Sequence, residues 1–450
     1  MKKSHSSFLS TTRIIMLSFL ATIFVGSLLL KLPVSSANGI SVPYIDALFT
    51  ATTATCVTGL VTLPTVTTWS VFGQIVILIL IQAGGLGIVT IMSGIMIGLH
   101  KKMGLADRLL IQDAFNLNTL SGLIKFIKKV IIGTFIVEGI GALLYMTVFV
   151  PEFGLKGIWI SVFTSVSAFC NAGIDIIAEN SLCNYACNPV INIVTSMLII
   201  ISGIGYIVWW DVIRVLSLKT NRKFSHLTLH SKIAIISTLI LIFAGAILIF
   251  IFEFRNPLTI ESFSLFDKIQ VSFFQSVTTR TAGFATVPQE NLTNASSLVC
   301  LILMFIGGSP VGTAGGVKTV TVAVIIAASI SSVKGKNEVN LFSRNIRKEA
   351  VSKATAVVGM SFLIMAASTI LLSMVIKADV LDILYETVSA TATVGLTRNL
   401  TPFLNLAGKI IIILTMYLGR VGPISLAVAF NQKKASPNII KNPIEEISVG

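Results

Sequence analysis

The stretch SATATVGLTRN, Ser389 to Asn399, gathers small hydroxyl-bearing residues in front of a glycine. It lies in a 450-residue chain that is 54% hydrophobic and only 12% charged, with a mean hydropathy of +0.90. Polar side chains inside so apolar a chain need protein or water around them. The stretch therefore indicates a specialised segment of a membrane protein.

The pattern of this stretch occurs four times. The fifteen residues ending at Gly395, LDILYETVSATATVG, align with three others: IDALFTATTATCVTG ending at Gly59, WISVFTSVSAFCNAG ending at Gly173, and IQVSFFQSVTTRTAG ending at Gly283. Each has an aromatic residue at its fifth position (Phe49, Phe163, Phe273 and Tyr385) and then a run rich in Ser and Thr. The glycines are 114, 110 and 112 residues apart. The chain is therefore predicted to contain four copies of a unit of roughly 110 residues.

Apolar runs of membrane-spanning length flank the short segments, for example Ile14–Leu30 and Ile233–Phe252. A span needs about 20 apolar residues, so we predict an all-α polytopic membrane protein with a single membrane domain. A cleavable signal peptide after Lys2 and Lys3 is the less favoured alternative, because the repeat needs the first apolar run as a permanent helix. The predicted units, with their short segments, are 1–100 (about 41–60), 101–218 (about 157–174), 219–335 (about 263–284) and 336–450 (about 379–397).

The short segments can enter the membrane and return, but they cannot cross it. Irregular backbone at membrane depth must be covered by protein or must line a water-filled cavity. A half-helix followed by an extended strand that ends in glycine can direct backbone carbonyl groups at an axis. We therefore predict that the four strands form a ring around a pore.

The charges predict the orientation of the chain. The stretches 101–129, 214–232 and 334–353 and the two ends of the chain carry 23 of the 33 Lys and Arg residues. By the positive-inside rule these regions and both termini are cytoplasmic. The acidic residues beside the short segments are then on the outside, where they attract cations. The net charge of +14 is explained by this topology and by contact with anionic membrane lipids, without nucleic acid as a partner.

The residues around the four glycines resemble the filter sequences of the Trk/Ktr/HKT potassium transporter superfamily. The resemblance covers nearly the whole chain and is greatest to the membrane subunit of bacterial Ktr systems, because the chain has no room for the additional helices of Trk-type subunits. It implies four units of one helix (M1), a pore loop and a second helix (M2) around one pseudo-fourfold pore. It also implies that potassium binds at backbone carbonyls of a filter. The expected filter residues are Cys56, Val57, Thr58, Gly59, Cys170, Asn171, Ala172, Gly173, Thr281, Ala282, Gly283, Thr393, Val394 and Gly395.

The resemblance further implies potassium uptake across the bacterial cytoplasmic (inner) membrane by a homodimer. It implies a cytoplasmic, octameric ring of nucleotide-binding RCK subunits as regulator, sodium as an activator, and no covalently bound cofactor. Cys56 departs from the family pattern, in which Thr is usual in the first loop. A site built from backbone carbonyls would tolerate this change.

A second glycine-rich run, GGSPVGTAGG from Gly307 to Gly316, interrupts the apolar segment Leu298–Ile330. It lacks the spacing of a phosphate-binding loop, and a break within a membrane must line a cavity. The resemblance makes it an intramembrane gating loop below the filter. The expected gating residues are Gly307, Gly308, Ser309, Gly312, Thr313, Gly315, Gly316, Lys318 and Arg420.

The charged residues near these loops leave alternatives open. Lys318 and Arg420 could each be an interfacial cation, although Arg420 matches the family arginine that opposes the gating loop. Arg280 is expected to brace the filter through Asp382 or Glu386. Cys183 and Cys187 lie four residues apart, but a disulfide between them is not the favoured interpretation.

Two other function classes are considered. An alternating-access secondary carrier for a cation or small solute also uses broken helices, but carriers usually show two inverted repeats rather than four parallel ones. An intramembrane enzyme is not expected, because no His or Asp accompanies the Ser and Thr residues as a base.

Overall fold

The computed structural model describes residues 11–100, 104–114, 122–218, 223–336 and 338–422. The described chain is almost entirely helical and passes four times through a long helix, a short helix, an irregular segment and a further helix. The long helices are α1 (Thr11–Lys31), α7 (Leu123–Phe153), α11 (Leu229–Glu253) and α15 (Lys348–Val375). The short helices are α2 (Tyr44–Cys56), α8 (Lys156–Cys170), α12 (Leu265–Thr278) and α16 (Val380–Ala392).

The helices that follow the short segments are broken in the first three passes, and the fourth is described only as far as residue 422. α4 (Val71–Leu86) and α5 (Ile88–Gly98) meet at an angle of 98°, and α9 (Pro189–Gly203) and α10 (Tyr206–Leu216) meet at 94°. Residues 306–318 separate α13 (Asn294–Phe305) from α14 (Thr319–Val333), as predicted from the glycine-rich run. The last helix, α17 (Leu406–Val421), ends at the edge of the described residues. The four long helices, and each bent pair taken as one span, are long and apolar enough to cross a membrane.

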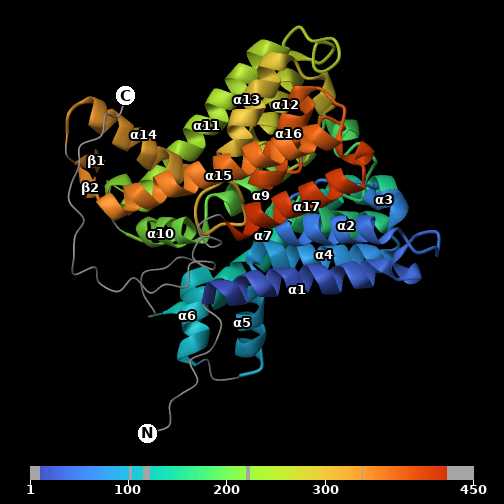
Figure 1. Cartoon of the computed structure of the whole chain (residues 1–450), viewed down its shortest axis with the longest axis horizontal. Coiled ribbons are helices and arrows are strands. Elements are labelled where there is room, and N and C mark those ends of the chain that lie inside the picture. The colour runs from blue at the N-terminus through green and yellow to red at the C-terminus, as the bar shows by residue number, and fades with distance from the viewer. Residues whose placement is uncertain (1–10, 101–103, 115–121, 219–222, 337, 423–450) are drawn as a thin grey trace.

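The remaining elements connect these helices. They are α3 (Thr65–Thr68), α6 (Leu105–Ala114), the short 3₁₀ turns η1 (Pro33–Ser35), η2 (Cys183–Tyr185), η3 (Lys223–His226), η4 (Gln289–Asn291) and η5 (Thr401–Phe403), and the strands β1 (Val339–Leu341) and β2 (Arg344–Ile346). The two strands pair antiparallel and form a hairpin between α14 and α15. Figure 1 shows this hairpin at the end of the molecule that also holds α5, α6 and α10.

The short helices are the centre of the core. Their aromatic residues Phe49, Phe163 and Tyr385 are fully buried, as is Phe274 in the third copy. The sequence alignment selected Phe273 instead, but this residue is only partly buried. The third copy thus has one residue fewer between its buried aromatic residue and its glycine.

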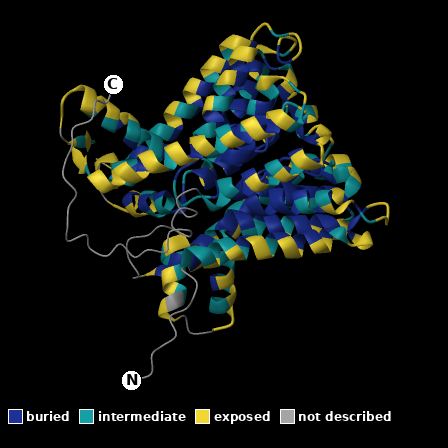
Figure 2. Cartoon of the chain, viewed as in Figure 1, coloured by how far each residue is buried: buried dark blue, intermediate teal, exposed yellow. Residues whose placement is uncertain are grey.

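Apolar side chains also cover the outer faces of the long helices, where Figure 2 shows exposed residues. Phe24 on α1, Phe135 on α7, Ile240 on α11 and Leu363 on α15 are between 55% and 62% exposed. Large apolar side chains in such numbers on every outer face fit hydrocarbon rather than water. The protein is therefore an all-α polytopic membrane protein. The unit boundaries at residues 100, 218 and 335 stay a prediction.

Candidate functional site

A left-handed turn follows each short helix; in the first, second and fourth copies it begins at the C-cap of the helix, and in the third it begins two residues after the C-cap. The residue two positions before each glycine has a left-handed conformation, with φ of 56° at Val57, 59° at Asn171, 76° at Thr281 and 51° at Thr393. The glycines Gly59, Gly173, Gly283 and Gly395 also have positive φ, between 62° and 98°. Two residues with positive φ within three positions change the direction of the chain, so that an extended strand follows the helix. A side chain at the second of these residues, the glycine, would strain the backbone.

A hydroxyl group at the end of each short helix holds the strand that follows. Thr53 Oγ1 accepts from the Gly59 amide at 2.9 Å, and Ser389 Oγ accepts from the Gly395 amide at 3.0 Å. Ser167 Oγ accepts from the Ile174 amide at 3.1 Å. In the third copy Thr278 Oγ1 donates to the carbonyl oxygen of Phe284 at 2.6 Å. The Ser/Thr-rich run therefore supplies hydrogen-bond partners for a strand that has no adjacent strand to pair with.

The four strands close into one ring. A Cβ atom added at Gly59 would lie 2.5 Å from the carbonyl oxygen of Ala172, and one added at Gly283 would lie 2.5 Å from that of Val394. A Cβ at Gly173 would collide in the same way with Ala282, and one at Gly395 with Thr58. The strands therefore follow one another in chain order, and the fourth contacts the first.

The residues predicted for the filter all lie in or directly behind this ring. They are buried: Cys56, Val57, Thr58, Gly59, Cys170, Asn171, Ala172, Gly173, Thr281, Ala282, Gly283, Thr393, Val394 and Gly395. The Cys170 side chain packs against Gly85 of α4, where an added Cβ would lie 2.6 Å from Cys170 Sγ. This thiol is therefore behind the second strand.

The irregular segment 306–318 lies against the ring and is held by neighbouring helices. Its backbone bonds to the break between α9 and α10: the Ser309 amide donates to the Gly203 carbonyl at 2.8 Å, and the Tyr206 amide donates to the Val311 carbonyl at 2.9 Å. Thr313 Oγ1 accepts from Asn171 Nδ2 at 2.8 Å, which joins the segment to the second strand. A Cβ added at Gly315 would collide with Thr393 of the fourth strand.

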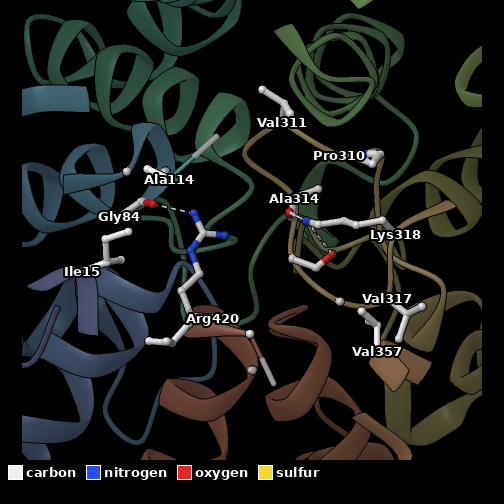
Figure 3. Close-up of a pocket in the computed structure, with 18 of the residues that line it drawn as sticks. Ile15, Gly84, Ala114, Pro310, Val311, Ala314, Val317, Lys318, Val357 and Arg420 are labelled. Carbon is white, nitrogen blue, oxygen red and sulfur yellow. Dashed lines mark hydrogen bonds between the residues drawn. The ribbon is translucent and has the colours of Figure 1, made fainter. Parts of the chain in front are cut away.

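Arg420 and Lys318 both donate to backbone carbonyls in this region, as Figure 3 shows. Arg420 Nη1 donates to the Thr313 carbonyl at 2.7 Å, and its Nη2 donates to the Gly84 carbonyl. Lys318 Nζ donates to the Ala314 carbonyl and lies 3.4 Å from that of Gly315. Arg420 therefore links the end of α17 both to the glycine-rich segment and to the break after α4.

A cavity of about 880 Å³ lies on the other side of this segment from the ring. Arg420, Lys318 and Lys353 line it, together with Asp113 and His230. Its wall includes the breaks of α4–α5 and α9–α10 and the end of α17. The ring, the glycine-rich segment and the cavity thus succeed one another through the centre of the protein.

The prediction that Arg280 braces the ring through Asp382 or Glu386 is wrong. Arg280 is 6% exposed, and its Nη2 lies 3.4 Å from Thr238 Oγ1 of α11. Glu386 instead accepts from the hydroxyls of Thr397 and Thr401, both at 2.6 Å. These two threonines follow the fourth strand and satisfy the carboxylate locally.

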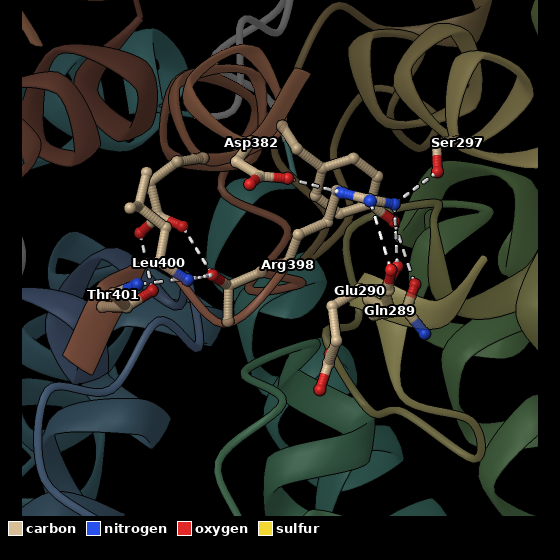
Figure 4. Close-up of polar contacts among 10 residues, drawn as sticks. Gln289, Glu290, Ser297, Asp382, Arg398, Leu400 and Thr401 are labelled. Carbon is tan, nitrogen blue, oxygen red and sulfur yellow. Dashed lines mark hydrogen bonds and ion pairs between the residues drawn. The ribbon is translucent and has the colours of Figure 1, made fainter. Parts of the chain in front are cut away.

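Asp382 pairs with Arg398, a residue that the sequence analysis did not select (Figure 4). Arg398 Nε lies 2.7 Å from Asp382 Oδ1. Its other nitrogens donate to Ser297 Oγ at 2.8 Å and to the carbonyls of Gln289 and Glu290, both at 3.1 Å. All three acceptors belong to the third copy, so Arg398 joins the third and fourth copies beside the ring.

The other neighbouring copies have similar links. Lys409 Nζ of α17 lies 2.5 Å from Asp46 Oδ1 of α2, which joins the fourth copy to the first. Trp159 Nε1 of α8 donates to Gln74 Oε1 of α4 at 2.8 Å. The Leu182 amide donates to the Ala285 carbonyl at 3.0 Å, which joins the second copy to the third. Polar contacts thus hold all four junctions around the ring.

Cys183 and Cys187, which lie between α8 and α9, are both free. The Cys183 thiol lies 3.6 Å from the Ala285 carbonyl oxygen. Burial, with the nearby carboxylates of Glu290 and Asp175, raises the pKa of the Cys183 thiol to about 12. This thiol is protonated at neutral pH, which disfavours disulfide formation.

Comparisons with known proteins agree with this architecture. The TrkH family, described as "Cation transport protein", matches residues 3–442. The chain is 39% identical to the Ktr system potassium uptake protein B of Bacillus subtilis over 97% of this chain and 96% of that protein. It is also 39% identical to the potassium/sodium uptake protein NtpJ of Enterococcus hirae, over 100% of this chain and 99% of that protein.

A solved structure has the same fold. The potassium transporter TrkH from Vibrio parahaemolyticus superposes with a TM-score of 0.77 and 15% sequence identity, over 96% of this chain and 87% of that one. The family match extends over nearly all of the sequence that contains the ring and the glycine-rich segment. The chain belongs to the TrkH family of cation transport proteins.

Proposed function

We propose that this protein takes up potassium across the bacterial cytoplasmic membrane through a filter of backbone carbonyls. The observation that carries the proposal is the closed ring of four buried strands with glycines facing one another. Backbone carbonyls in such a ring can replace the hydration shell of a potassium ion. The full-length relatives named as potassium or potassium/sodium uptake proteins support the same ion.

A secondary carrier is the alternative. The bends of 98° and 94° in two helix pairs are the kind of break that carriers use to bind solutes. The four strands in one ring favour a pore, because the ring has a single axis and all four copies contribute to it equally. Saturable exchange of one solute for another in proteoliposomes would favour the carrier.

The glycine-rich segment is proposed to be the gate of this pore. It lies between the ring and the 880 Å³ cavity, and Arg420 donates to one of its carbonyls. A positive charge fixed beside an ion path repels cations. Movement of this segment together with Arg420 would open the path.

Uptake itself is tested in a bacterium that lacks its own potassium transporters. We expect expression of this chain to restore growth at low potassium and to support accumulation of rubidium, a potassium substitute. The control is the same chain with Gly59→Asp, which places a side chain and a charge in the ring. Growth that is equal with the wild-type chain and the control would refute the proposal.

The proposed assembly is a homodimer with a cytoplasmic RCK ring as regulator, and sodium as an activator. The printed names of the relatives, "Ktr system", support a system with more than one component. We place the contact at the basic hairpin region from Lys334 to Arg347, with the stretch from Lys219 to His230, of which 219–222 lie outside the described residues. Both regions are predicted to face the cytoplasm with the two termini.

Replacing the Lys and Arg residues of both regions by Gln should weaken co-purification with an RCK protein. The matched control replaces Lys377 and Lys156, which are exposed and lie just after α15 and at the start of α8. Binding that survives the loop changes would place the contact elsewhere. An RCK protein that never binds the wild-type chain would argue against the partner itself.

A further inference from the structure

The long helix α7 carries a carboxyl group in its middle. Glu138 is 4% exposed and lies fifteen residues from either end of this membrane-spanning helix. None of the salt bridges found among the described residues involves Glu138. An ionisable residue within a span is costly to insert, so its presence favours a functional role.

Two polar side chains surround the Glu138 carboxyl group. Gln82 Nε2 of α4 donates to Glu138 Oε2 at 3.2 Å. The Cys170 thiol lies 3.5 Å from Gln82 Oε1 and 3.9 Å from Glu138 Oε1. The three side chains come from α7, α4 and α8 and form one polar cluster, in which Glu138 and Cys170 are buried and Gln82 is partly buried.

The third copy shows that packing alone does not require an acid here. Ser165 Oγ of α8 donates to the Glu138 backbone carbonyl at 2.7 Å. In the third copy Ser276 Oγ of α12 makes the same contact with the backbone carbonyl of Ile242, also at 2.7 Å. Ile242 is 2% exposed. An apolar side chain therefore fills this place where no polar cluster forms.

The cluster joins the second strand to the helix end that holds Arg420. Cys170 is the last residue of α8, three residues before Gly173. Gln82 lies in the last turn of α4, two residues before Gly84, whose carbonyl accepts from Arg420. Close packing of Gly85 on Cys170 leaves no room for the two elements to shift independently.

We propose that Glu138 is a positioning residue that fixes the second filter strand to the end of α4 through Gln82 and Cys170. This inference rests on the proposed function of the ring. By holding Cys170, Glu138 sets the position of the strand Asn171–Gly173 and so the size of the ring. Loss of the carboxyl group should affect which ion the ring prefers, rather than only the amount of protein in the membrane.

The test compares rubidium uptake by Glu138→Leu and Gln82→Leu with that of the wild-type chain. We expect each variant to raise the half-saturating rubidium concentration and to lower the preference for rubidium over sodium by roughly fivefold, the effect of losing one buried hydrogen bond. The exchanged pair, Gln82→Glu with Glu138→Gln, keeps an amide and a carboxyl group in contact. The exchanged pair should recover most of the wild-type rubidium affinity and of the preference for rubidium over sodium. If the single variants only disturbed packing, the exchange would not restore these two properties.

A second readout does not depend on transport. Peptide-resolved alkylation of Cys170 by a membrane-permeant maleimide should be slow in the wild-type chain and several-fold faster in Glu138→Leu, since the thiol loses its partners and the strand loosens. Ile242→Leu, the matched change in the third copy, should leave the rate unchanged.

The outcomes separate this inference from the proposed function. Unchanged ion preference and unchanged alkylation in Glu138→Leu would overturn the role of Glu138, even if the wild-type chain takes up potassium. If the wild-type chain takes up no rubidium, the proposed function fails and the alkylation rates alone decide whether Glu138 positions the strand. If Glu138→Leu does not reach the membrane, Gln82→Leu and the exchanged pair decide.

Discussion

At the scale of single residues, the small hydroxyl side chains explain how a strand can stand alone inside a membrane protein. A strand of the ring has no neighbouring strand to pair with, so its backbone groups need other partners. Thr53, Ser167, Thr278 and Ser389 each supply one from the end of the preceding helix. A hydroxyl group is short enough to reach back to the strand without filling the ring.

The first prediction concerns the glycines of the ring. Gly59→Ser adds a side chain at φ 98°, where a Cβ would lie 2.5 Å from the Ala172 carbonyl oxygen. The ring must widen or distort, so we expect weaker rubidium uptake and stronger competition by sodium. Gly395→Ser should behave alike, because its Cβ would collide with Thr58.

Gly359→Ser is the control for this comparison, since an added Cβ there meets nothing within 4 Å. It should keep wild-type uptake and ion preference. The filter assignment would be wrong if both ring variants matched this control in affinity and in selectivity.

The second prediction concerns Arg398. Its side chain is 12% exposed and donates to four acceptors on two copies. Arg398→Ala leaves buried acceptors without donors, and we expect the free energy of unfolding to fall by roughly 2 to 4 kcal/mol. Arg398→Lys should recover little of this loss, because an ammonium group cannot reproduce the planar guanidinium fork.

Thermal unfolding of the purified protein in detergent measures the effect of these changes. Arg255→Ala, a change on the same outer side in a loop after α11, should leave the unfolding temperature nearly unaltered. An unfolding temperature for Arg398→Ala equal to that of Arg255→Ala would show that these contacts contribute no stability.

Sequence reasoning found the ring residues but not all of their partners. The glycines and hydroxyls recur in one frame, so their place in a ring of four strands could be predicted from the repeat. Arg398 stood inside the opening stretch, yet three of its four acceptors lie about a hundred residues earlier in the chain, and no local pattern joins them. The prediction for Arg280 was wrong for the same reason, because its neighbour Thr238 lies on a different helix.

At the scale of elements, the break between α13 and α14 combines a glycine-rich backbone with several anchoring contacts. Gly307 to Gly316 contains five glycines in ten residues, which lowers the cost of rearranging its backbone. Hydrogen bonds join it to Gly203, Tyr206 and Asn171, and its glycines pack closely on neighbouring backbone: a Cβ added at Gly312 would lie 2.7 Å from the Ser202 carbonyl oxygen. We therefore expect any movement of this segment to break several of these contacts together.

The third prediction concerns this segment and Arg420. At about 4 Å and an effective dielectric of about 20, a fixed unit charge repels a cation by about 4 kcal/mol. We therefore expect Arg420→Ala, or deletion of part of Gly308–Gly315, to raise the maximal rubidium flux and to reduce the need for the cytoplasmic partner. The preference for rubidium over sodium should stay largely intact, because the ring is unchanged.

Lys353→Ala is the matched control, since it removes a positive charge from the same cavity but not from the segment. Its flux should remain closer to wild type. If the wild-type chain and both variants show equal rubidium flux at equal amounts of protein in the membrane, the segment and Arg420 do not form a gate. A loss of selectivity would instead show that the segment supports the ring.

The elements also show where repeat analysis is accurate and where it fails. The position of the break was predictable, because glycines and a lysine cannot continue an apolar span. The one-residue difference in the third copy could not be predicted. The alignment was anchored at the glycine, and the third copy has two adjacent aromatic residues, Phe273 and Phe274, between which the sequence does not decide. Only burial separates them.

At the scale of the whole molecule, the first and last copies must meet before the ring is complete. Lys409 and Asp46 form this junction although they are 363 residues apart in the chain. Their side chains are 15% and 8% exposed, so the pair is largely shielded from water. Thr62 Oγ1 donates to the same carboxylate at 2.8 Å and completes its hydrogen bonding.

The fourth prediction follows from the burial of this pair. Lys409→Met leaves the Asp46 charge without its partner, and breaking a buried pair from one side typically costs about 3 to 5 kcal/mol. Asp46→Asn combined with Lys409→Met removes both charges and should restore much of the lost stability. The two single variants and the double variant form a double-mutant cycle, whose coupling energy measures the interaction between Lys409 and Asp46.

The unfolding temperature and the rate of rubidium uptake should fall and recover together in this cycle, because opening the junction between the fourth and first copies also opens the ring. Additive effects of the two changes would mean that the copies are held at this junction by apolar packing alone.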